Sequence, residues 1–127
     1  MKNKLLAVLA LAVSLLVVSG PLFAHHSVTN YDREHPVTLT GTVTDFQFIN
    51  PHVLIVFEVR AEDGSVVAWV AGSGPRQNLE RAGWNRQSLK PGDQITVTGA
   101  PHKEGKKEVS VINLVGPAGQ VLTQPVN

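Results

Sequence analysis

Histidines are the residues of this sequence best suited to chemistry. The chain has five of them, His25, His26, His35, His52 and His102, and it has no cysteine. The absence of cysteine excludes a disulfide framework, a thiolate zinc site and a cysteine nucleophile. Imidazole nitrogen is a common ligand of zinc, copper, iron and nickel. The sequence therefore directs attention to a binding site built on histidine.

The chemistry of His25 depends on how the N-terminus is processed. Two lysines precede an uncharged run of 14 residues, 5–18, and a Ser-Gly-Pro segment and Ala24 follow it. This is the layout of a secretory signal peptide over residues 1–24. A membrane-spanning helix is the alternative, but such a helix needs about 20 apolar residues. We therefore expect cleavage after Ala24, export to the bacterial periplasm, and a mature chain without a stable membrane anchor.

Cleavage after Ala24 would give His25 a free α-amine. That amine, with a pKa near 8, and the Nδ1 atom of the same residue can chelate one metal ion. One more imidazole completes a set of nitrogen ligands that suits Cu(II), and the peptide nitrogen between His25 and His26 can join it. The common amino-terminal copper motif needs histidine at position three, where this chain has Ser27. The alternative is that both histidines form a solvated end.

His52 is the third candidate ligand. It follows Asn50 and Pro51, and we expect it to begin a central strand, where it would be rigid and close to the binding face. The alternative is that its ring bonds to a backbone carbonyl of its own turn. We expect His35 and His102 to be solvated. The predicted metal site is therefore His25, His26 and His52, next to Asn50 and Pro51, with copper as the metal.

Other patterns of catalytic or binding residues are weak in this sequence. There is no G-x-S-x-G or H-E-x-x-H motif, and the Gly-Ser-Gly-Pro segment 72–75 lacks the lysine of a P-loop. Trp69 and Trp84 could stack on a base or a sugar, but core packing suits their positions better. Arg76, Arg81 and Arg86 fit a solvated helix face better than an anion site.

Composition sets the broad class. The chain has 127 residues, 43% of them hydrophobic, which is enough for one domain with a single core. It has 11 basic and 10 acidic residues, and removing Lys2 and Lys4 with the signal peptide leaves 9 against 10, a formal charge of −1. This balance argues against a nucleic-acid partner.

Alternation of apolar and polar residues predicts most of the secondary structure. Strands are expected from Val37 to about Phe48, with a bulge near Asp45, and over 52–60, 66–71, 94–99 and 108–115, with a short sixth strand near Val121. Asp63 and Gly64 predict a tight hairpin with positive φ angles. A short helix is expected over 76–82, capped by Ser73 or Gly74, with Pro75 in its first turn and Gly83 after its end.

Three strands, a helix and two strands is the element order of a small five-stranded Greek-key barrel, the OB-fold. A β-sandwich is the alternative, but it would usually have more strands and no central helix. The expected organisation is a signal peptide (1–24), an N-terminal arm (25–36) and the barrel domain (37–127).

Several segments together resemble an uncharacterised family of small exported bacterial proteins. The family pairs a mature His-His-Ser start with an Asn-Pro-His turn, and Phe48 stands where members often carry tryptophan. The resemblance covers nearly all of the mature chain and implies no established reaction, but it singles out the same histidines. The matching segments are His25-His26-Ser27, Tyr31-Asp32-Arg33-Glu34, residues 36–43, Asn50-Pro51-His52, Gly83-Trp84 and Leu89-Lys90-Pro91-Gly92-Asp93.

The sequence thus predicts a periplasmic OB-like domain that binds copper for carriage, buffering or delivery. An alternative of a different class is a metal-free module that binds a peptide or an envelope protein. An oxidative copper enzyme is a weaker alternative, because its chemistry needs a larger shaped surface for substrate.

Overall fold

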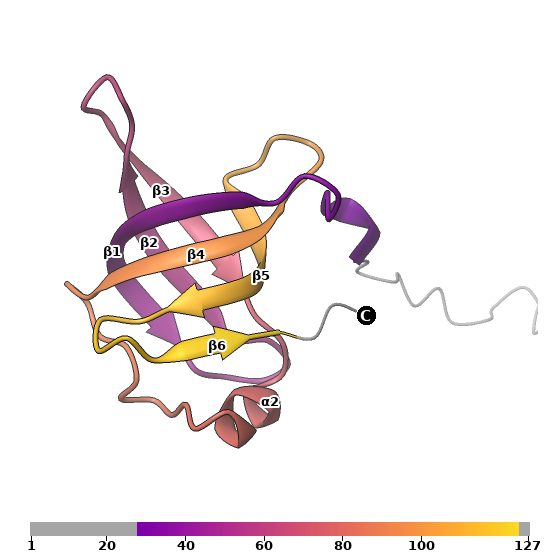
Figure 1. Cartoon of the computed structure of the whole chain (residues 1–127), viewed down its shortest axis with the longest axis vertical. Coiled ribbons are helices and arrows are strands. Elements are labelled where there is room, and N and C mark those ends of the chain that lie inside the picture. The colour runs from indigo at the N-terminus through magenta and orange to yellow at the C-terminus, as the bar shows by residue number, and fades with distance from the viewer. Residues whose placement is uncertain (1–27, 125–127) are drawn as a thin grey trace, which may run out of the picture.

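The structure, a computed structural model, describes residues 28–124 as a β-barrel with one short helix below it (Figure 1). A 3-10 helix, η1 (Val28–Asn30), comes first, and α2 (Arg76–Arg81) lies between the third and fourth strands. The strands are β1 (Val37–Gln47), β2 (Leu54–Arg60), β3 (Val66–Gly72), β4 (Gln94–Pro101), β5 (Glu108–Val115) and β6 (Val121–Thr123). The predicted order of three strands, a helix and two strands is confirmed.

The barrel closes because β1 is long enough to pair with two strands, β4 and β2. Its first half, Val37–Thr42, pairs with β4, and its second half, Thr42–Gln47, pairs with β2. A parallel pairing of β3 with β5 joins the remaining edges, and β6 extends the sheet beside β5. This is the predicted five-stranded Greek-key barrel.

The predicted bulge in β1 is confirmed. The register against β2 shifts between Val43 and Asp45, so one extra residue is accommodated there. Val43 and Phe48 are both buried, although they have opposite parity in the sequence. The bulge therefore keeps both apolar ends of this segment inside the barrel.

The short helix closes one end of the core. Leu79 is fully buried, and Trp84, which follows the helix, is also part of the core cluster. The expectation that Ser73 or Gly74 caps the helix is wrong, because Pro75 is the N-cap and no side chain bonds to the free N–H groups. The Ser73 hydroxyl instead accepts a hydrogen bond of 2.9 Å from Gln124 Nε2.

The β2–β3 hairpin turns differently from the prediction. Gly64 has a φ angle of +86°, but no residue other than glycine has a positive φ among residues 28–124. The Gly64 N–H donates to the Ala61 carbonyl at 2.9 Å, and the Ala61 N–H donates to the Ser65 carbonyl at 2.8 Å. The connection is therefore a type I turn followed by a left-handed glycine, and only Gly64 needs the special backbone conformation.

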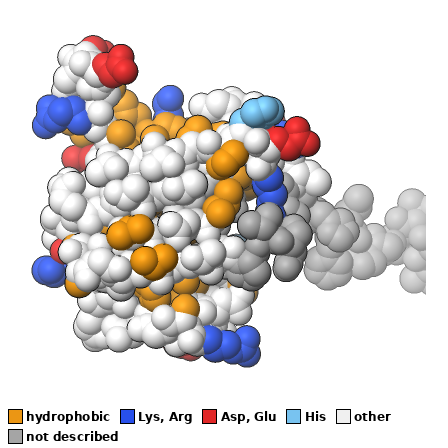
Figure 2. All heavy atoms as spheres, viewed as in Figure 1, with side chains coloured by type: hydrophobic (Ala, Val, Ile, Leu, Met, Phe, Trp, Pro, Cys, Tyr) orange, Lys and Arg blue, Asp and Glu red, His pale blue; other side chains and the backbone are white. Residues whose placement is uncertain are grey.

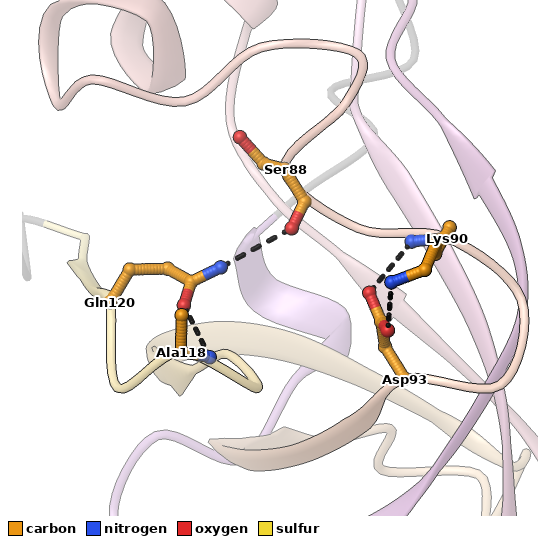
Figure 3. Close-up of polar contacts among 5 residues, drawn as sticks. All are labelled: Ser88, Lys90, Asp93, Ala118 and Gln120. Carbon is orange, nitrogen blue, oxygen red and sulfur yellow. Dashed lines mark hydrogen bonds and ion pairs between the residues drawn. The ribbon is translucent and has the colours of Figure 1, made fainter.

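Polar contacts tie the long loop after α2 to its surroundings (Figure 3). Gln120, in the β5–β6 turn, donates from Nε2 to the Ser88 carbonyl at 3.2 Å and accepts from the Ala118 N–H at 2.9 Å. Asp93 accepts from both the backbone N–H and the ammonium group of Lys90, each at 2.9 Å. These bonds hold the loop that carries the buried Leu89. Within residues 28–124, no helix is long and apolar enough to span a bilayer.

Candidate functional site

A pocket of about 500 Å³ lies where four segments meet: the N-terminal arm, the entry to β2, the end of β3 and the β4–β5 loop. Its size is within the range of small-molecule sites. Both described histidines outside the arm, His52 and His102, line it. The full lining is Asn30, Tyr31, Arg33, His52, Leu54, Gly72, Ser73, Gly74, Ala100, His102, Lys106, Glu108, Ser110, Val111, Ile112 and Gln124.

His52 lies just before β2 and not in its first position as predicted, because β2 begins at Leu54. Its ring is exposed. The next residue, Val53, makes two backbone hydrogen bonds. Its N–H donates to the Gly74 carbonyl at 3.2 Å, and its carbonyl accepts from the Ser73 N–H at 2.8 Å. The His52 ring makes no hydrogen bond with residues 28–124, so the expected alternative, a bond to its own turn, is not seen there.

His102 contradicts the expectation of a solvated side chain. It is only 7% exposed. The Tyr31 ring meets its imidazole edge-on, with centroids 5.3 Å apart and planes at 79°. Its Nδ1 accepts a hydrogen bond of 3.1 Å from the Glu104 backbone N–H. The imidazole is therefore fixed in place on one wall of the pocket.

A second bulge explains why the sequence did not reveal His102. The register of β4 against β5 shifts between Thr98 and Gly99. Ile95 and Val97 face the core before the shift, and Ala100 and His102 are buried after it. Simple alternation from Ile95 would have placed His102 on the outer face. Gly99 is the sequence signal that could have revealed this bulge, because a glycine inside a strand often marks one.

The N-terminal arm is docked at this pocket. Tyr31 forms an isolated antiparallel bridge with His102. On either side of it, the Lys103 N–H donates to the Asn30 carbonyl and the Asp32 N–H donates to the Pro101 carbonyl, both at 2.8 Å. These bonds make residues 30–32 a short extra edge beside the end of β4.

Tyr31 also reaches the entry to β5. Its hydroxyl donates to Glu108 Oε2 over 3.4 Å. Burial raises the pKa of the Tyr31 hydroxyl above its usual value of 10.0, and the nearby Glu108 carboxylate raises it further. Tyr31 is therefore a neutral donor at neutral pH.

Asp32 organises the turn that leads from the arm into β1. Its carboxylate accepts from the backbone N–H groups of Glu34 and His35, and its Oδ2 lies 2.9 Å from His35 Nδ1. The hydrogen bond to His35 is the largest cause that lowers the pKa of Asp32. His35 is exposed, as predicted.

Of the other predicted site residues, the structure describes Asn50 and Pro51. His25 and His26 lie outside the described residues. Asn50 and Pro51, joined by a cis peptide bond, are exposed and do not line the pocket. Among residues 28–124, no three His, Asp or Glu side chains come together in a metal-binding group.

Within residues 28–124, the tryptophans and charged side chains form no second site of this kind. Trp84 is buried in the core, as predicted, while Trp69 packs at the core's edge with Lys107 Nζ 5.1 Å from its ring centroid. Arg81 and Arg86 are exposed, and Arg76 pairs with Glu80 at 3.1 Å. On the face shown in Figure 2, charged side chains are scattered at the margins and form no patch of one sign.

Residues 12–110 match a family described as a family of unknown function, DUF6152. No curated protein matches the sequence. Among solved structures, the mitochondrial single-stranded DNA-binding protein Rim1 of S. cerevisiae is similar at 8% identity and a TM-score of 0.49, over 72% of this chain and 96% of that one. The ZRD-deleted mutant of TiaS in complex with agmatine is similar at 16% identity and a TM-score of 0.42, over 63% of this chain and 20% of that one. Both likenesses are too distant to bear on function.

Proposed function

The chain belongs to DUF6152, a family of unknown function, and we propose from its site that it is an exported, periplasmic copper-binding domain. In this proposal the amine and ring of His25, with the peptide nitrogen before His26, hold Cu(II) together with the ring of His52. The domain carries or buffers the metal and has no catalytic role.

The docking of the arm is the observation that supports this proposal. Asn30 and Tyr31 line the same pocket as His52, although they are about 20 residues apart in the sequence. Val28, where η1 begins, is the third residue after His25, and an extended chain spans at most about 3.6 Å per residue. The covalent chain therefore lets His25 lie no farther than about 11 Å from Val28, which is two residues before the first lining residue, Asn30.

The state of the His52 ring also supports the proposal. A histidine ligand needs a free nitrogen lone pair, and the His52 ring is exposed and not engaged by residues 28–124. The ligands proposed here are an amine and imidazoles. A site made of such nitrogen ligands binds Cu(II) more tightly than it binds the other divalent metals of the first transition row.

Copper titration of the mature protein, residues 25–127, tests the proposal by calorimetry and electron paramagnetic resonance. We expect one Cu(II) per chain, with affinity that falls as the pH drops below about 8, because the amine must lose its proton. One extra alanine before His25 should weaken binding strongly without deleting a side chain. His52→Ala should weaken it at least about tenfold, or about 1.4 kcal/mol.

His35→Ala is the matched control, because His35 is exposed and its ring bonds to Asp32 outside the pocket. Its copper affinity should equal that of the wild type. Equal affinity in the wild type, the extended protein and His52→Ala would overturn the copper proposal in favour of the metal-free interaction module.

A further inference from the structure

The inner wall of the pocket, around His102, has chemistry that a copper site at His52 does not use. We propose that it binds a small organic monocarboxylate, with His102 Nε2–H donating a hydrogen bond to the carboxylate. This site goes beyond the proposed copper function and does not depend on it.

A hydrogen bond at His102 Nδ1 fixes the tautomer of its neutral ring. A backbone N–H can only donate, so the Glu104 N–H at 3.1 Å requires a lone pair on His102 Nδ1. In the neutral ring the proton is then on Nε2. Among the hydrogen bonds of residues 28–124, none involves Nε2. His102 is only 7% exposed and lines the pocket, and its Nε2–H donor meets no residue of 28–124.

Among residues 28–124, the one side-chain nitrogen or oxygen that is wholly buried without a hydrogen-bond partner is Arg76 Nε, so His102 Nε2 keeps some contact with solvent. A donor fixed in this way on the wall of a pocket meets water or a ligand there. A metal ion does not suit this position, because Nε2 carries a proton in this tautomer and has no free lone pair for a metal. The partner must be a hydrogen-bond acceptor.

The charges around the pocket favour an anion with a single charge. Arg33 and Lys106 line the pocket, and Glu108 is the one acidic side chain among its described lining residues. Glu108 accepts from Tyr31, and Lys106 also lies 3.4 Å from Glu104. Among the lining side chains two cations stand against one carboxylate, and Glu104 offsets part of the Lys106 charge from outside the lining. This balance suits at most a single negative charge on the ligand, because a dianion would meet stronger repulsion from Glu108.

The remaining lining indicates an organic body on this anion. Leu54, Val111 and Ile112 supply apolar walls, and a pocket of about 500 Å³ is larger than an inorganic ion needs. The apolar walls would hold a short carbon chain, while His102 and Lys106 meet the carboxylate.

A nuclear magnetic resonance titration of the metal-free mature protein with isovalerate tests the proposal. We expect saturable shifts of the His102 ring signals. The neutral isostere isovaleramide and inorganic phosphate should each bind at least about tenfold more weakly, because a hydrogen bond to a charged group contributes about 1.5 to 3 kcal/mol. Isovaleramide or phosphate binding as tightly as isovalerate would overturn the proposal.

Lysine variants locate the carboxylate without disturbing the core. Lys106→Gln should weaken isovalerate binding by about threefold to tenfold. Lys103→Gln is the matched control, because Lys103 is exposed in the same loop and does not line the pocket; its affinity should be unchanged. Equal loss in both variants would mean a general charge effect and would contradict a built site.

Variants of His102 test the donor itself. His102→Gln keeps an N–H donor near the Nε2 position and should retain binding, whereas His102→Leu should lose it. Both need an unfolding curve as a check, because the side chain is buried, and the lysine pair decides the matter if either variant unfolds. His52→Ala should retain isovalerate binding, so failure of the copper proposal and failure of this one give different results.

Discussion

Replacing Gly41 by alanine tests the way in which the barrel closes. Gly41 lies on β1 one residue before Thr42, which pairs with both β2 and β4. A Cβ atom at Gly41 would overlap the Glu58 carbonyl oxygen, and it would lie 2.9 Å from Phe57 Cδ2. Phe57 is fully buried, and a backbone carbonyl cannot rotate away, so the two strands would have to separate.

The size of the effect follows from two opposing terms. Forcing an extra methyl group into a packed site costs about 1 to 3 kcal/mol, and the backbone contact places Gly41→Ala at the upper end. The alanine offsets about 0.5 to 1 kcal/mol of this cost by restricting the unfolded chain. We therefore expect a net loss of about 2 kcal/mol, which corresponds to a fall in Tm of about 8 to 16 °C for a domain of this size.

Gly72→Ala is the matched control on another strand. The nearest atoms to its added Cβ would be Leu54 Cδ2 and the Val109 carbonyl oxygen, both at 3.9 Å, which is ordinary van der Waals contact. Here only the unfolded-state effect remains, so the variant should be unchanged or more stable by up to about 1 kcal/mol.

Urea unfolding of the wild type and both variants, followed by circular dichroism, measures these changes. The midpoints should move in opposite directions, or only that of Gly41→Ala should move. A Gly41→Ala variant as stable as the wild type would refute the close approach of β1 and β2. Equal destabilisation by both substitutions would instead mean that strand glycines are needed for a reason other than local contact.

Three further predictions concern other parts of the chain. Hydrogen bonds from the Lys90 side chain and backbone lower the pKa of Asp93, so Asp93→Asn should reduce stability at neutral pH. That difference from the wild type should disappear as the pH falls through the lowered pKa, and a pH-independent difference in urea midpoints would contradict it. Leu79→Ala should lower the free energy of unfolding by about 2 to 5 kcal/mol, because Leu79 is fully buried; a loss under about 1 kcal/mol would mean that α2 does not seal the barrel. The intact mass of the exported protein should correspond to a start at His25, and any other start would remove the proposed amine ligand.

Most of the fold could be predicted from local patterns. The bulge in β1 was recognisable because Val43 and Phe48 are both apolar and have opposite parity, which a regular strand cannot bury together. The cap of α2 was predicted wrongly, because the Ser73 hydroxyl has a distant partner, Gln124, that no local rule reveals. The hairpin at Gly64 was predicted with the right glycine but the wrong turn type, because Asp63 keeps a negative φ.

The candidate site was predicted only in part. His52 does line the pocket, while its position in the loop before β2 differs from the predicted strand. His102 was assigned to the solvent because the loop around it is charged. That prediction was wrong because the bulge at Gly99 reverses the parity of β4 and turns His102 inward. Tyr31 appeared only within the family-like segment Tyr31-Asp32-Arg33-Glu34, with no role assigned to it, and Glu108 gave no signal.

What the sequence determined by itself is therefore the set of local elements: which segments alternate as strands, where the turns lie, and which histidines stand at turns or at the expected mature end. Those features depend on backbone sterics and on side-chain periodicity over a few residues. Only the tertiary structure decided that the arm, the entry to β2 and the β4–β5 loop meet at one pocket. These segments are brought together by barrel closure and by hydrogen bonds such as Lys103 N–H to the Asn30 carbonyl, which join residues far apart in the chain. Such contacts become favourable only once the whole core is buried, so no short stretch of sequence carries them.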